Sequence, residues 1–64
     1  MTKDQVLASL TEFNRRDAEF RRKHPESKLG YVGPGLRPRN AQWVLVMVCG
    51  VPFEQANELI AEAA

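Results

Sequence analysis

The sequence predicts a small all-α domain of three helices with a central loop rich in proline and glycine. Three observations carry this prediction: a capping-box pattern at Thr2 and Gln5, a helical stripe of apolar residues from Val6 to Phe20, and a second stripe from Phe53 to Ala63. The chain has 64 residues. We therefore expect one domain spanning residues 1–64, with a small core and a stability of about 3 to 9 kcal/mol.

The first helix is predicted from Lys3 to Lys23. In a capping box, the Thr2 hydroxyl accepts a backbone hydrogen bond while the Gln5 side chain reaches back to the helix start. The apolar residues that follow recur at steps of three, four and seven, namely Val6, Leu10, Phe13 and Phe20, with Leu7 at the edge. Asp17 interrupts this stripe. It is expected to pair with Arg21 or, as we favour, to lie where the helix has left the core.

The central loop is predicted over residues 24–40, where three prolines and three glycines interrupt regular structure. Four apolar residues in it indicate a loop pinned over one side of the core: Leu29, Tyr31, Val32 and Leu36. Tyr31 combines apolar bulk with a hydroxyl and lies in this loop. It is therefore a better candidate for an exposed binding anchor than Trp43.

The second helix is the ambiguous element. Every residue from Trp43 to Cys49 is apolar, so periodicity cannot separate a buried helix from a buried strand. Asn40 as an N-cap and Gly50 as a stop favour a helix over residues 41–49. The alternative is an α+β fold with strands at Leu29–Val32 and Trp43–Cys49. In a domain this small, Trp43 is expected at the centre of the core.

The last helix is predicted after Pro52, which suits a first helical turn. Its buried stripe is expected to contain Phe53, Ala56, Ile60 and Ala63, with Leu59 beside them, and its exposed side carries an acidic ridge of Glu54, Glu58 and Glu62. Residues 42–61 also fit the apolar positions of a helix-turn-helix. The side that would face DNA has no Lys or Arg, and only Asn57 could contact an adenine. We interpret the pair as a structural unit.

Charge is unevenly distributed along the chain. Residues 15–39 hold eight Lys and Arg against three Asp and Glu, whereas the only charges after Arg39 are the three glutamates of the acidic ridge. The candidate partner-binding residues are these cations and the loop tyrosine: Arg15, Arg16, Arg21, Arg22, Lys23, Tyr31, Arg37 and Arg39. Such a basic centre suits an acidic partner.

The functional expectation is a non-enzymatic regulatory or inhibitor-like protein that occupies a macromolecular partner. The favoured partner is a protein with an acidic surface, or a second copy of the chain; the alternative is nucleic acid, whose phosphates the same cations would contact. Cys49 and His24 are the sole residues of their types, so we expect no metal site, cofactor, small-molecule substrate or catalytic centre. No membrane association is expected. The first residues lack a signal-peptide pattern, which predicts a cytoplasmic location.

Overall fold

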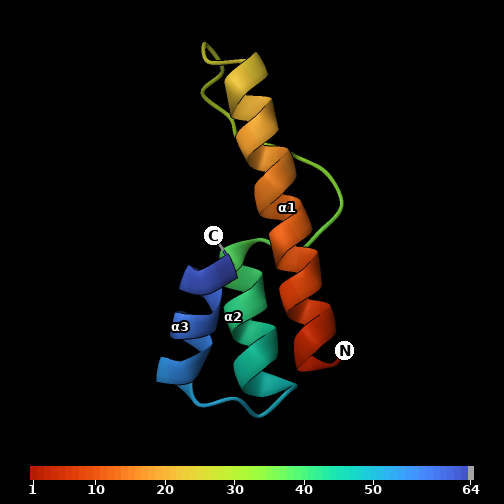
Figure 1. Ribbon diagram of the computed structural model, residues 1–64, viewed down its shortest axis with the longest axis vertical. Helices are drawn as coiled ribbons and strands as arrows, with labels where there is room; N and C mark the ends of the chain where they lie inside the picture. The colour runs from red at the N-terminus through yellow and green to blue at the C-terminus, as the bar shows by residue number, and fades with distance from the viewer. Residues whose placement is uncertain (64) are drawn as a thin grey trace.

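The computed structural model describes residues 1–63 and contains three helices: α1 (Lys3–Lys23), α2 (Pro38–Met47) and α3 (Phe53–Ala63) (Figure 1). No strand occurs between residues 1 and 63. The all-α prediction is therefore confirmed, and the α+β alternative with strands at 29–32 and 43–49 is wrong.

The start of α1 follows from its capping box. The Thr2 hydroxyl accepts a hydrogen bond from the Gln5 backbone N–H at 3.2 Å, and the Gln5 side chain accepts one from the Thr2 N–H at 2.9 Å. The helix ends at Lys23 because the following His24 precedes Pro25, and a residue before proline disfavours the helical conformation. Both predicted bounds of α1 are confirmed.

The core occupies only one end of the molecule. Its buried residues come from all three helices: Val6, Leu10 and Phe13 of α1, Ala41 and Leu45 of α2, and Ala56 of α3. The second half of α1 extends beyond α2 and α3, and the central loop runs back along it (Figure 1). We call residues 14–36 the arm. The resulting molecule is elongated, with extents of 38 × 19 × 16 Å.

The bounds of α2 differ from the prediction. The helix begins at Pro38, with Arg37 rather than Asn40 as its N-cap residue. Proline suits the first position of a helix because its fixed φ is helical and its missing N–H would be unpaired there. The helix ends at Met47, and Gly50, with φ +71°, lets the chain turn so that the Val51 N–H donates to the Leu45 carbonyl at 2.8 Å.

Trp43 is exposed, and its predicted place in the core is wrong. Its side chain is 61% exposed, because Ala41 and Leu45 form the buried side of α2 and a residue two positions from each falls on the opposite side. Phe53, predicted to join the buried stripe of α3, is 59% exposed at the first position of that helix. Ala56 is buried as predicted.

The central loop returns to the core at Gly35. Its φ is +118°, and a Cβ at this position would lie 2.9 Å from the Cβ of Phe13, so glycine allows the loop to cross α1 closely. The next residue fixes the crossing, since the Leu36 N–H donates to the Ser9 hydroxyl at 3.0 Å and the Leu36 side chain packs against the core. Leu29 and Val32, also predicted to cover the core, are exposed instead.

Candidate functional site

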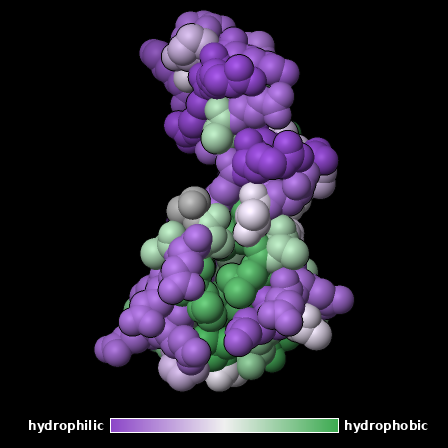
Figure 2. Space-filling model, in the orientation of Figure 1, coloured by the Kyte–Doolittle hydropathy of each residue, from purple (hydrophilic) through white to green (hydrophobic). Residues whose placement is uncertain are grey.

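The arm carries five of the seven cations that the sequence singled out, and Arg37 and Arg39 lie at the start of α2. Figure 2 shows hydrophilic residues over the arm, whereas hydrophobic residues gather on the part of this face formed by the three-helix end. Because the arm lies outside the core, its order depends on contacts between the loop and α1.

Asp17 joins the loop to α1. One carboxylate oxygen accepts a hydrogen bond from the Tyr31 backbone N–H at 2.8 Å, and the other accepts one from the Arg21 Nε at 2.9 Å. These contacts, the Tyr31 N–H first, lower the pKa of Asp17. A Cβ at Gly30 would lie 2.9 Å from the Arg21 Nη2 and 3.0 Å from the Asp17 Oδ1, so a larger residue at this position would require these two side chains to shift. Asp17 lies beyond the core, as the favoured expectation had it. It also forms the ion pair with Arg21 that was the alternative expectation.

Tyr31 is half-buried against α1 rather than a free anchor. Its ring centroid lies 5.5 Å from that of Phe13, with the two rings inclined at 59°. Its hydroxyl accepts a hydrogen bond from Arg16 at 3.4 Å. The aromatic contact and the Asp17 hydrogen bond hold Tyr31 on the surface of the helix.

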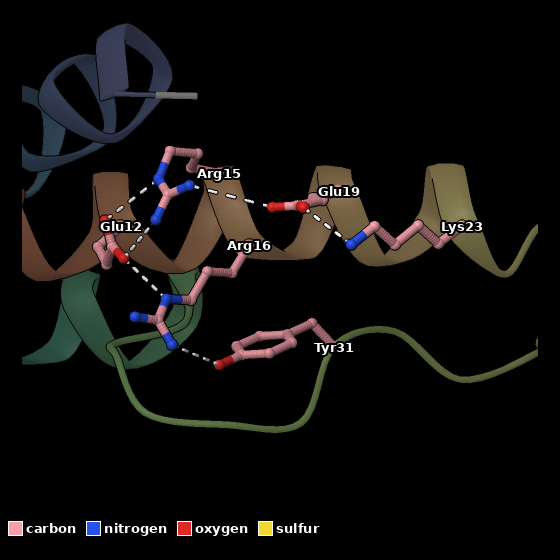
Figure 3. A network of polar contacts seen from close by, with 6 residues as sticks. All are labelled: Glu12, Arg15, Arg16, Glu19, Lys23 and Tyr31. Atoms are coloured by element: carbon pink, nitrogen blue, oxygen red, sulfur yellow. Dashed lines mark hydrogen bonds and ion pairs between the residues drawn. The ribbon is translucent and has the colours of Figure 1, made fainter.

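A network of ion pairs runs along the same side of the arm (Figure 3). Glu12 accepts hydrogen bonds from Arg15 and Arg16, each with a shortest distance of 2.7 Å. Glu19 pairs with Lys23 at 3.1 Å and lies 4.0 Å from Arg15. Together with Arg21, which pairs with Asp17, four of the predicted binding cations therefore pair with carboxylates of their own helix.

We predict that acid weakens this network only well below the ordinary range of a glutamate. Hydrogen bonds from Arg15 and then Arg16 lower the pKa of Glu12 from 4.5 to about 2. A lowered folded pKa gives a stabilising contribution that is present above the unfolded pKa and is lost as pH falls toward 2. The Glu12 carboxyl 13C shift, followed by NMR against pH, measures this value. Arg16→Gln should return the titration toward higher pH, and a wild-type midpoint near 4.5 would contradict the network.

Two grooves flank Tyr31. The first has a volume of about 390 Å³ and is lined by Phe13, Asn14, Asp17, Arg21, Leu29, Gly30, Tyr31, Val32, Arg37 and Pro38. We call it the loop groove. The second, of about 330 Å³, lies on the ion-pair side and is lined by Arg15, Arg16, Glu19, Phe20, Lys23, His24 and Tyr31.

The structure thus divides the predicted site residues. Arg21 and Arg37 line the loop groove, and Arg15, Arg16 and Lys23 line the second groove. Arg22 lines neither of these grooves. Arg39 lies on α2, beside Trp43.

Sequence reasoning missed three apolar residues of the loop groove as site candidates: Phe13, Leu29 and Val32. Phe13 belongs to the apolar stripe of α1, and helical periodicity does not distinguish a core residue from a residue that lines a groove. In the structure Phe13 is 6% exposed, and the Arg37 guanidinium lies 5.9 Å from the centre of its ring. Leu29 and Val32 lie within two residues of Tyr31 in the sequence, and this proximity could have identified them as part of the same site.

The geometry of the α2–α3 pair differs from that of a helix-turn-helix. Asn57, the residue that could contact an adenine, accepts a hydrogen bond from Gln42 at 2.6 Å. The two helices run in opposite directions side by side (Figure 1), whereas a helix-turn-helix crosses its helices steeply. These observations favour the structural interpretation of residues 42–61.

Other classes of site receive no support from the part of the chain that the structure describes. There, His, Cys, Asp and Glu form no cluster suited to a metal ion, and no helix has the length and apolar character to span a membrane. Comparison with protein-family models, curated proteins and solved structures finds no significant match to this chain.

Proposed function

We propose that this chain is a non-enzymatic binding protein whose loop groove holds an acidic, partly apolar segment of a partner protein. The observation that carries the proposal is the composition of the groove: apolar walls from Phe13, Leu29 and Val32 beside the guanidinium groups of Arg21 and Arg37. Apolar surface supplies affinity, and the cations select an acidic partner.

The two loop walls of the groove, Leu29 and Val32, are available to a partner, whereas Phe13 is only 6% exposed. Leu29 and Val32 are 74% and 75% exposed. These are the highest values among the large apolar side chains between residues 1 and 63. Tyr31 stands between them and is already ordered by Asp17 and Phe13. Binding therefore loses little conformational entropy at the aromatic residue, which is a property of binding hot spots.

The charges of the groove favour an acidic segment. Asp17 is occupied by the Tyr31 N–H and Arg21, so it offers little repulsion. Arg37 forms no ion pair with a carboxylate among the described residues. A partner carboxylate that meets Arg37 beside the Phe13 ring gains a charge-assisted hydrogen bond on a partly apolar surface.

A binding role accords better with these groups than catalysis does. The groove offers guanidinium groups, a phenol and a carboxylate that is already hydrogen-bonded, which do not form a nucleophile with an adjacent base. Cys49 and His24 follow the ends of α2 and α1, which point toward opposite ends of the molecule (Figure 1).

Protein is favoured over nucleic acid because of the ion-pair network. Arg15, Arg16 and Lys23 would have to leave Glu12 and Glu19 to contact phosphates, or bind beside those carboxylates. The loop groove contains both apolar surface and cations, which matches a protein segment better than a phosphate backbone.

The test is a selection of random 12-residue peptides displayed on phage against the immobilised chain, followed by titration of a selected peptide. We expect enriched peptides to combine Asp or Glu with a large apolar residue. Val32→Ser should weaken their binding by about fivefold or more, as loss of a hot-spot contact does. The matched control is Val48→Ser, which removes an exposed valine (57%) at the end of α2 and should bind as the wild type does.

Two outcomes would contradict the proposal. One is a set of peptides without acidic bias, or with equal affinity for Val32→Ser. The other is tight binding of generic duplex DNA whose affinity falls with salt at a log–log slope of about −0.9 per phosphate contact, which would support the nucleic-acid alternative.

A further inference from the structure

A second exposed apolar surface lies on the other part of the molecule. Trp43 and Met47 of α2 and Phe53 of α3 are 61%, 65% and 59% exposed. They border a groove of about 310 Å³ whose remaining lining residues are Arg39, Asn40, Gln42 and Val46. We call these seven residues the Trp43 face. No residue of it lines the loop groove.

The apolar content of this face is not explained by the fold of a single copy. The buried side of α2 is formed by Ala41 and Leu45, and Trp43 and Met47 add little burial. Large apolar residues gathered on an exposed face of so small a domain mark an interaction surface. Trp is also among the residues most enriched at binding hot spots.

The charges around the face have opposite signs on its two sides. Arg39 is the only charged residue of α2, and the only charges of α3 are Glu54, Glu58 and Glu62. Glu54 directly follows Phe53 and lies about 200° around the helix from the buried Ala56, so it points outward. The face thus contains a cation, Arg39, on the α2 side, and on the α3 side the carboxylate of Glu54 directly follows its residue Phe53 in the chain.

This arrangement is complementary to itself. In a two-fold symmetric interface, a residue on one side of the axis faces a residue from the other side of the second copy. An axis through the apolar centre therefore brings Trp43 and Met47 of the two copies together and sets the cation of each copy toward the carboxylates of the other.

We propose that the Trp43 face is the interface of a symmetric homodimer, with Arg39 of each copy opposite Glu54 of the other. A standard interface buries about 800 Å² per partner, which is about a sixth of the 4716 Å² surface of this chain. The arm stays free in the dimer, so this proposal does not depend on the proposed function.

The experiment is sedimentation equilibrium from about 1 µM to about 1 mM, combined with fluorescence of Trp43, the only tryptophan. We expect a reversible monomer–dimer equilibrium in which the tryptophan emission shifts to shorter wavelength as dimer forms. Met47→Ser, which changes an exposed side chain, should weaken the dimer about tenfold or more. Val32→Ser on the arm is the control and should dimerise as the wild type does.

A charge exchange tests the predicted pairing. Arg39→Glu and Glu54→Arg should each weaken the dimer, because like charges then meet across the axis. The double variant should recover most of the wild-type affinity. A chain that stays monomeric at about 1 mM overturns the proposal. A dimer that Met47→Ser leaves unchanged overturns it as well, since the interface then lies elsewhere.

Discussion

Leu45→Ala should unfold much of this protein, whereas Trp43→Ala should leave it folded. Leu45 is fully buried at the contact of α2 with the other helices. Removing a buried leucine costs about 2 to 5 kcal/mol, and a domain of this size has a total stability of about 3 to 9 kcal/mol. Trp43 lies on the exposed side of the same helix and gives up little burial on truncation.

Urea unfolding followed by far-UV circular dichroism measures both effects. The chain is kept at a low micromolar concentration, so that self-association does not contribute to stability. A cost for Trp43→Ala as large as that for Leu45→Ala would contradict the exposed position of the indole and return Trp43 to the core.

Local signals predicted most of the fold. The capping box and the stripe of Val6, Leu10 and Phe13 determine α1 through contacts between near neighbours in sequence. The helical nature of α2 was also correct. The sequence could not predict which side of α2 is buried, because every residue from Trp43 to Cys49 is apolar and no periodicity distinguishes one side from the other. Tertiary contacts of Ala41 and Leu45 determine which side of α2 is buried, and Trp43 is exposed because it lies on the other side.

The candidate site was predictable in composition but not in arrangement. The ion pairs of Glu12 and Glu19 join residues three or four positions apart, a spacing that the sequence displays. The hydrogen bond between Asp17 and the Tyr31 N–H spans 14 residues and depends on the path of the loop. The loop groove exists because of that path, so the sequence revealed its cations without the apolar walls beside them.

Asp17→Ala should release the loop from the arm while the three-helix core stays folded. The substitution removes the acceptor of the Tyr31 N–H and the partner of Arg21. A hydrogen bond to a charged group contributes about 1.5 to 3 kcal/mol, and this applies to the part-buried bond from the Tyr31 N–H. The bond to Arg21 contributes little, because the Arg21 side chain is 68% exposed and solvent screens the pair. We expect amide hydrogen exchange at Tyr31 to accelerate about tenfold or more, with Leu10 and Leu45 unchanged.

Two further variants separate the charge of Asp17 from its hydrogen bond. Asp17→Asn keeps an oxygen that can accept from the Tyr31 N–H but loses the negative charge, so exchange at Tyr31 should lie between wild type and Asp17→Ala. Glu26→Ala is the control, because Glu26 is an exposed carboxylate of the same loop and its one ion pair among the described residues is with His24. The lowered pKa of Asp17 adds a dependence on pH: the contact is present above the ordinary pKa of an aspartate and is lost as pH falls through the lowered value. Unchanged exchange at Tyr31 in Asp17→Ala would mean that the contact between the Phe13 and Tyr31 rings holds the loop by itself, and the loop groove would then persist without its carboxylate.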